Sequence, residues 1–188
     1  INQFTLQASY EKNLGSHYFK VLGGMQTEEL LGRSFAAGRK FFKYAGFEDL
    51  NNGDVLSATN SGSHYEWAML SYYGRLNYNY LERYLLEVNS RFDASTRFKG
   101  KNQWGYFPSV SAGWRISEEP FFQNIKNSIN DLKLRGSYGT LGNQAIGSYY
   151  PYAAAIYSGQ GYWFDYNQGT GVAQTEVANE NISWEKSR

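Results

Sequence analysis

Few residues in this 188-residue chain have the types and spacing that enzymatic chemistry requires. The sequence contains no cysteine, so disulfides, thiolate metal sites and cysteine nucleophiles are excluded within it. The carboxylates Glu118 and Glu119 are adjacent in sequence, whereas glycosidases hold two carboxyl groups about 5 to 9.5 Å apart across the scissile bond. The nucleophile motif GxSxG does not occur. We therefore expect that the chain is not an enzyme.

The sequence also offers no pattern for a metal, a cofactor or a nucleic acid. His17 and His64 are the two histidines, and they form no HExxH or similar spacing. Gly139, Gly142 and Gly147 superficially resemble a phosphate loop, but the lysine and following helix of such a loop are missing. The net charge of +1 gives no reason to expect a nucleic-acid partner. We expect no metal site and no cofactor.

The stretch from 157 to 166, with the sequence YSGQGYWFDY, is the strongest candidate for a binding feature. Aromatic faces stack on sugar rings, and Asp165 and Asn167 offer hydrogen-bonding groups beside them. The alternative is that these aromatic side chains pack the loop on itself or against a partner protein. The candidate substrate-binding residues are Tyr157, Tyr162, Trp163, Asp165 and Tyr166.

A second candidate set consists of charged residues that share one side of the predicted strands. These charges could line a solute path or brace a domain inside it. The alternative is a solvated wall in which opposite charges on neighbouring strands pair. Each solvent-exposed ion pair of this kind contributes little to stability. The set is Arg75, Glu87, Arg91, Asp93, Arg115, Lys133 and Arg135.

An alternation of apolar and polar residues predicts the elements that carry these charges. In the run that ends at residue 80, Tyr72 and Leu76 alternate with Arg75 and Asn77. Because successive side chains on a strand point to opposite faces, this period of two predicts strands with one apolar and one polar face. The predicted strands lie near residues 2–11, 17–27, 66–80, 84–97, 106–117 and 132–141.

The predicted connections differ in length between the two ends of such a sheet. Outer-membrane barrels show this asymmetry, with short periplasmic turns and longer extracellular loops. One end carries a turn near Asn13, a turn at 81–83 and a connector at 118–131 in which the spacing of Phe122, Ile125 and Ile129 indicates a helical turn. The other end carries the long loop 28–65, a loop near 98–105 and the long loop 142–183.

Strand length and aromatic placement favour a membrane barrel over a soluble sandwich, which would bury its apolar face. The two runs before residue 98 continue for about 14 residues, whereas globular strands average about 5 to 6 residues and membrane strands need about 9 to 11. Two aromatic bands, one with Tyr78, Tyr80 and Tyr84 and one with Trp104, Tyr106 and Phe107, flank an aliphatic middle, as interfacial girdles do. We predict an all-β, transmembrane, antiparallel up-and-down β-barrel. No apolar run reaches the length of a transmembrane helix.

Several motifs occur in fixed order and carry a family likeness. They are YxGRxNY from Tyr72, RxDxSxRF from Arg91, WGxFPSxxxGWR from Trp104, LKLRxSYGxxGNQ from Leu132 and NxxWEK from Asn181. With them the chain resembles the SusC/RagA family of TonB-linked (TonB-dependent) outer-membrane proteins of Bacteroidetes. The likeness is strong over residues 66–150 and moderate over 178–186, where SWEK is expected to begin a further strand.

The resemblance implies a fold and a function that go beyond the pattern. Such proteins are barrels of about 22 strands with a plugged lumen, so residues 1–188 are expected to form about six strands of the later half, with the plug domain absent. The charged set would then face the lumen and the apolar face would contact lipid. The implied function is TonB-dependent uptake of oligosaccharides or peptides across the bacterial outer membrane.

The expected partners are a SusD-like surface lipoprotein, TonB through the missing N-terminal region, the transported solute and the lipid bilayer. The alternative that remains open is a soluble or surface-exposed β-sandwich that binds carbohydrate, as a binding module or an adhesin.

Overall fold

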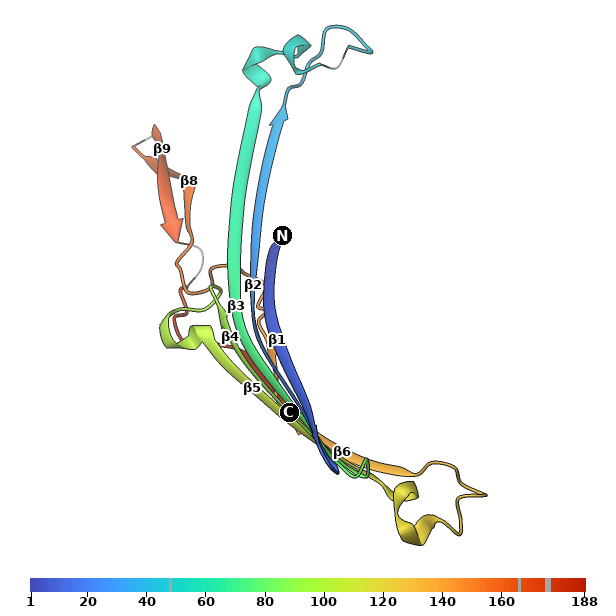
Figure 1. The fold of residues 1–188 in the computed structure, drawn as a ribbon. Helices are drawn as coiled ribbons and strands as arrows, with labels where there is room; N and C mark the ends of the chain where they lie inside the picture. The colour runs from blue at the N-terminus through green and yellow to red at the C-terminus, as the bar shows by residue number, and fades with distance from the viewer. Residues whose placement is uncertain (48, 166, 175–176) are drawn as a thin grey trace.

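One curved, six-stranded antiparallel sheet dominates the computed structural model, which describes residues 1–47, 49–165, 167–174 and 177–188 (Figure 1). The strands are neighbours in chain order, as in an up-and-down meander, and β1 and β6 form two separate edges, so the sheet is not closed. The strands are β1 (Asn2–Leu14), β2 (His17–Gly38), β3 (Thr59–Tyr80), β4 (Tyr84–Ser95), β5 (Trp104–Arg115) and β6 (Lys133–Gly139).

The pairing register places the alternating apolar residues in rows that cross the sheet on one face. Such rows arise because side chains directly opposite one another in paired strands share a face. The central row consists of Tyr10, Val21, Leu76, Val88, Val110 and Tyr138. A second row, farther from the β1–β2 and β3–β4 turns, consists of Leu6, Met25, Tyr72, Phe92 and Tyr106.

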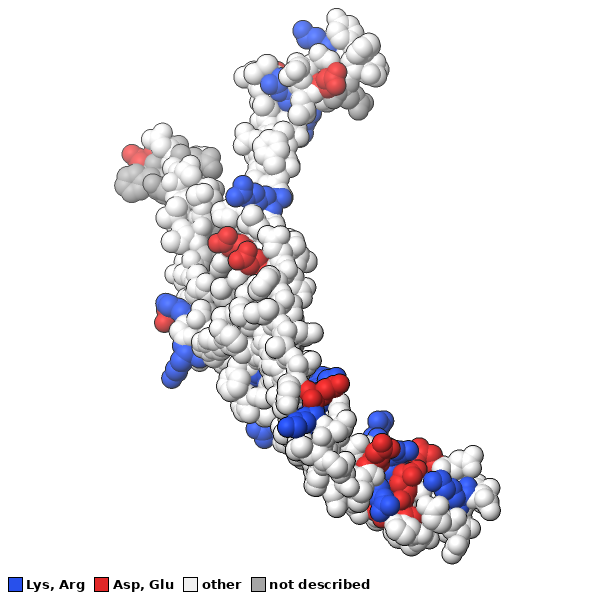
Figure 2. All heavy atoms as spheres, viewed as in Figure 1, with Lys and Arg blue, Asp and Glu red and all other residues white. Residues whose placement is uncertain are grey.

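This apolar face is open to its surroundings. Leu76 and Val88 are each 37% exposed and Leu134 is 62% exposed, whereas a sandwich would bury such residues beneath a second sheet. In the view of Figure 2, Lys, Arg, Asp and Glu crowd the end that carries the β5–β6 connector and recur at intervals along the molecule, with mostly uncharged surface between these groups. The uncovered apolar face matches the predicted barrel wall and argues against the sandwich.

The short connections gather at one end of the sheet, here called the short-turn end. Gly15 has φ +60° in the β1–β2 turn, and Leu81 and Glu82 have φ +53° and +54° in the β3–β4 turn. The β5–β6 connector contains two 3₁₀ turns, η4 (Ile116–Glu118) and η5 (Pro120–Phe122), in the region where helical spacing was predicted. No helix in the described residues is long and apolar enough to cross a membrane.

The opposite end, here called the long-loop end, differs from the sequence prediction. Strands β2 and β3 remain paired from His17↔Tyr80 to Gly38↔Thr59, so the predicted loop 28–65 narrows to residues 39–58 with η1 (Leu50–Asn52) and η2 (Val55–Ser57). The result is a two-stranded ribbon that projects well beyond the other strands (Figure 1). Both faces of the ribbon are largely exposed, so the sequence there lacks the apolar period that reveals a half-buried strand.

The predicted loop 142–183 also contains strands. A separate hairpin is formed by β8 (Ile156–Phe164) and β9 (Asn167–Gln174). The short strand β7 (Leu141–Asn143) continues the line of β6 and pairs with β10 (Glu185–Ser187), so the SWEK segment does begin a further strand. A 3₁₀ turn, η3 (Gly100–Gln103), lies in the β4–β5 loop.

Candidate functional site

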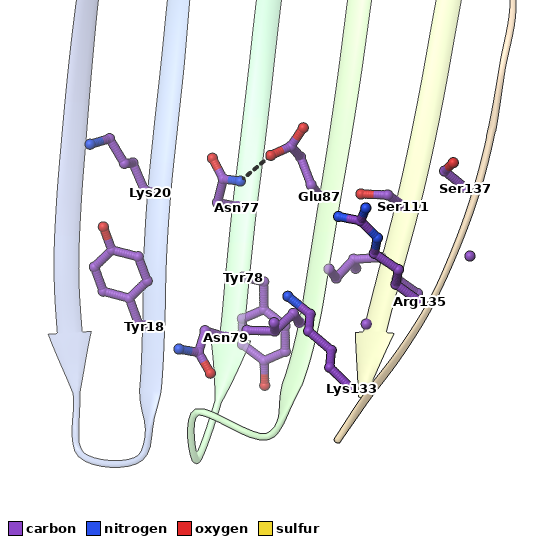
Figure 3. Close-up of a pocket in the computed structure, with 15 residues that line it drawn as sticks. Tyr18, Lys20, Asn77, Tyr78, Asn79, Glu87, Ser111, Lys133, Arg135 and Ser137 are labelled. Atoms are coloured by element: carbon purple, nitrogen blue, oxygen red, sulfur yellow. Dashed lines mark hydrogen bonds between the residues drawn. The ribbon is translucent and has the colours of Figure 1, made fainter. Parts of the chain in front are cut away.

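The polar face of the sheet is hollowed along its length, and this hollowed face is the candidate site. A hollow of about 610 Å³ lies toward the short-turn end, and one of about 760 Å³ lies beside it toward the long-loop end. Glu87, Ser111 and Ser137 line both hollows, so the two form one continuous polar trough. Figure 3 shows the first hollow, with side chains from β2 to β6 directed over it.

Two of the predicted charges form a compact cluster in the trough. Arg91 Nε donates to both carboxylate oxygens of Asp93 at 2.8 and 2.9 Å, and Arg91 Nη2 donates to Ser71 Oγ at 2.9 Å. Asp93 and Ser71 are buried, and the Arg91 guanidinium lies 6.0 Å from the ring centroid of Tyr73. This charge pair is therefore held within the wall.

A second network joins Arg75 to Glu87 through side-chain amides. Glu87 accepts hydrogen bonds from Asn77 at 2.7 Å and Asn89 at 2.8 Å, and Arg75 Nε donates to Asn89 Oδ1 at 2.7 Å. The two asparagines were not singled out from the sequence. The usable signal was the register, since Asn77 lies opposite Glu87 and Asn89 opposite Arg75.

The remaining predicted charges divide between two places. Arg115 joins the short-turn end, where it lies 3.6 Å from Glu118 and donates to the backbone oxygen of Glu82 at 3.4 Å. Lys133 and Arg135 instead line the first hollow, and in the described part of the chain neither side chain has an ion-pair or hydrogen-bond partner.

Glu119 organises the short-turn end, although nothing in the sequence distinguishes it beyond its place beside Glu118. Its buried carboxylate accepts from the Tyr84 hydroxyl at 2.6 Å and from Trp114 Nε1 at 3.0 Å, and Arg83 lies 3.4 Å away. These hydrogen bonds, the one from Tyr84 above all, lower the pKa of Glu119 below its ordinary value, and the charge of Arg83 acts in the same direction.

Of the predicted binding residues, Tyr157, Tyr162 and Trp163 belong to β8 of the β8–β9 hairpin, and neither Tyr157 nor Trp163 lines the trough. Trp163 is 72% exposed and Tyr157 is 51% exposed. Asp165 occupies the turn with φ +46°, and its backbone oxygen accepts from the Asn167 amide at 3.4 Å. Tyr166 and the side chain of Tyr162 lie outside the described residues. The hairpin thus presents Tyr157 and Trp163 outward.

An aromatic cluster fixes the two ends of the segment that carries this hairpin to the sheet, near residues 142–146 and 182–184. Phe98, Phe107 and Trp184 are buried together, and Trp184 Nε1 donates to the backbone oxygen of Gln103 at 2.9 Å. A Cβ at Gly142 would lie 2.1 Å from the Phe107 ring, so glycine is required there. Phe107 faces the trough rather than joining the aromatic band that the sequence predicted, because its neighbour Tyr106 occupies the apolar face.

A cation–π stack joins the segment between β7 and β8 to the part of β3 where the ribbon starts. The Arg97 guanidinium lies 5.2 Å from the Trp67 ring centroid and 4.8 Å from that of Tyr149, a geometry that favours attraction. The Tyr149 and Tyr65 rings stack at 4.6 Å. No single-sequence pattern pairs these residues, because they come from three separate segments.

The described residues contain no group of three or more His, Asp or Glu side chains that would hold a metal ion. His17 instead shares a hydrogen bond of 2.8 Å with the Tyr78 hydroxyl.

The chain is similar to known proteins over nearly its whole length. Residues 2–188 match a family model described as "TonB dependent receptor-like, beta-barrel". TonB-dependent receptor SusC of Bacteroides thetaiotaomicron is 32% identical over 187 residues, which cover 98% of this chain and 18% of that protein. TonB-dependent receptor P26 of Formosa agariphila is 33% identical over 190 residues, with the same coverage of 98% and 18%.

A solved structure of the RagAB peptide transporter superposes on 98% of this chain and 20% of its own, with a TM-score of 0.85 and 29% identity. The chain therefore spans about a fifth of the length of the relatives that it matches.

Proposed function

Since this chain belongs to the TonB-dependent receptor-like β-barrel family, we propose that its sheet forms part of the wall of a SusC-like importer in a bacterial outer membrane. The observation that carries this proposal is the contrast between the two faces of the sheet. The apolar rows are exposed, while the opposite face is a polar trough whose charges are largely paired. Lipid would cover the exposed apolar side chains of the first face, and a water-filled passage would solvate the polar side chains of the second.

The apolar rows set the position of the bilayer along the strands. From Tyr80 at the short-turn end to Leu70, β3 advances ten residues, or about 33 Å at about 3.3 Å per residue. A strand tilt of about 40° reduces this length to about 25 Å, the height of the apolar band in outer-membrane barrels. The ribbon beyond Leu70 then projects outside the membrane on the side of the long loops.

We further propose that the cargo is an oligosaccharide or a peptide, and that a SusD-like lipoprotein meets the long-loop end. The likeness to a structure named as a peptide transporter supports the peptide. Tyr157 and Trp163 are exposed on the β8–β9 hairpin, where they are available to cargo or to the lipoprotein. TonB would supply the energy through a part of the receptor outside these residues.

Uptake by cells tests the proposal. Deletion of the gene for the full-length receptor should abolish uptake of its labelled oligosaccharide or peptide cargo, and deletion of TonB should abolish the same uptake. Re-expression of the receptor should restore uptake only where TonB is present. Uptake that persists without TonB would contradict the proposed function.

A further inference from the structure

The hollow at the short-turn end carries an excess of positive charge. Its lining includes three cations, Lys20, Lys133 and Arg135, and one carboxylate, Glu87. Lys20 lies 3.3 Å from Glu11, and Glu87 is occupied by Asn77 and Asn89. Lys133 and Arg135 therefore stand out as the two cations of the hollow without a partner among the described residues.

The Lys133 side chain is directed over the hollow rather than away from it. A Cβ added at Gly113 would lie 3.2 Å from Lys133 Cε, so this side chain crosses β5 at the point where glycine leaves room. Figure 3 shows Lys133 and Arg135 both leaning from β6 toward the middle of the hollow. The two cations thus converge on the space that Ser111 and Ser137 also line.

The hollow also holds an unsatisfied polar atom. Asn79 lines it, and its side-chain oxygen is buried without a hydrogen-bond partner in the described residues. An unpaired buried acceptor carries a desolvation cost that a donor from a ligand or from water removes. The two unpartnered cations suit a ligand that carries a carboxylate. Asn79 lies three strands from Arg135 in the same row across the sheet, so its oxygen is a separate feature of the hollow.

We propose that this hollow binds a carboxylate-bearing part of the transported cargo, such as the C-terminus of a peptide or a uronic acid of an oligosaccharide. The proposal rests on the importer function proposed above and gives it a preference for acidic cargo. Arg135 offers the planar fork that pairs with carboxylates, and Lys133 adds a second charge. The volume of about 610 Å³ lies within the range of about 300 to 1,000 Å³ for small-molecule sites.

Binding of matched probe pairs to the purified full-length receptor tests the proposal. One pair is a Gly/Ser octapeptide with a free C-terminal carboxylate and the same peptide with a C-terminal amide. The other pair is tetragalacturonate and its methyl ester. Isothermal titration should show about tenfold tighter binding of the acidic member in at least one pair, and this preference should shrink as salt is added.

Three variants test whether Lys133 and Arg135 cause the preference for the acidic probe. K133Q and R135Q should each reduce the ratio of the two affinities within a probe pair, and the double variant should abolish the difference. K101Q is the matched control, because it removes one exposed charge from the β4–β5 loop outside the hollow and should leave the preference intact.

Each contrary outcome has a distinct meaning. Variants that leave the preference intact, or that weaken both members of a pair equally, overturn the inference. A lower melting temperature with an intact acid preference also overturns it, since the cations would then pair with a carboxylate of the receptor itself. Equal binding of both members by the wild type refutes only this inference, whereas failure to bind any probe counts against the proposed function as well.

Discussion

Individual charges in the trough differ in how firmly the wall holds them. The Asp93 carboxylate is buried and depends on Arg91 and its two hydrogen bonds, while Arg75 is more than half exposed and reaches Glu87 only at 4.0 Å. A buried acceptor that loses its donor keeps the full desolvation cost, whereas an exposed pair contributes little. The two arginines should therefore respond very differently to the same substitution.

Replacement of Arg91 by Met should lower the free energy of unfolding of the full-length receptor by about 1 to 3 kcal/mol, because Asp93 loses its partner. Arg75→Met should cost less than about 1 kcal/mol. Urea-induced unfolding in lipid vesicles measures both. The double change R91M/D93N should cost less than R91M alone, since no unpaired charge remains; a larger cost would argue against this pairing.

Glu119 predicts a local dependence on pH at the short-turn end. Its folded pKa lies below the ordinary value of 4.5, so the stability that its ionised form contributes is present above about pH 4.5 and is lost as the pH falls through the folded pKa. The protection of the connector 116–132 against hydrogen exchange, corrected for the pH dependence of intrinsic exchange, should fall in that acidic range. E119Q should remove this step, and an unchanged step in E119Q would assign it to another carboxylate.

At the scale of elements, the two faces of a strand should tolerate charge unequally. An Arg at Leu76, in the central apolar row, should destabilise the full-length receptor by about 2 to 4 kcal/mol in a bilayer. The same residue at Asn77, one position along β3 on the trough face, should be mild. Folding into lipid vesicles measures the two variants side by side, and equal costs would remove the basis for the membrane position.

Two tryptophans of the long segment after β7 differ in burial. Trp184 is 8% exposed in the aromatic cluster and Trp163 is 72% exposed on the β8–β9 hairpin. Trp184→Ala should destabilise the packing of this loop by about 3 to 5 kcal/mol and increase proteolysis within 144–183. Trp163→Ala should leave proteolysis unchanged, because it removes little buried surface; equal sensitivity would show that the cluster does not anchor the hairpin.

At the scale of the whole molecule, the six-stranded sheet leaves two edges and one apolar face without partners. Unpaired strand edges and an exposed apolar surface both promote association. Residues 1–188 expressed alone should therefore aggregate unless detergent is present, as sedimentation before and after detergent addition would show. A soluble, monomeric product without detergent would instead favour the β-sandwich alternative.

The sequence alone predicted the features that depend on local periodicity. Leu76, Val88 and Val110 were assigned to one face because the side-chain period of a strand is two, and pairing to neighbours cannot change that assignment without a shift in register. The ribbon that continues β2 and β3 was missed for the same physical reason. Both of its faces are largely exposed. Backbone hydrogen bonds hold the two strands together, and these leave no apolar period in the sequence.

Only the tertiary structure decided which side chains meet. Phe107 and Trp184 lie far apart in the chain, and they meet because the segment around Trp184 packs against β5. Asn89 becomes the partner of Arg75 through the β3–β4 register, and Lys133 and Arg135 differ from the other charges only because no described carboxylate lies opposite them. Alternation along a strand is a local property of the chain, whereas pairing, burial and the hollow itself are set by the register between strands.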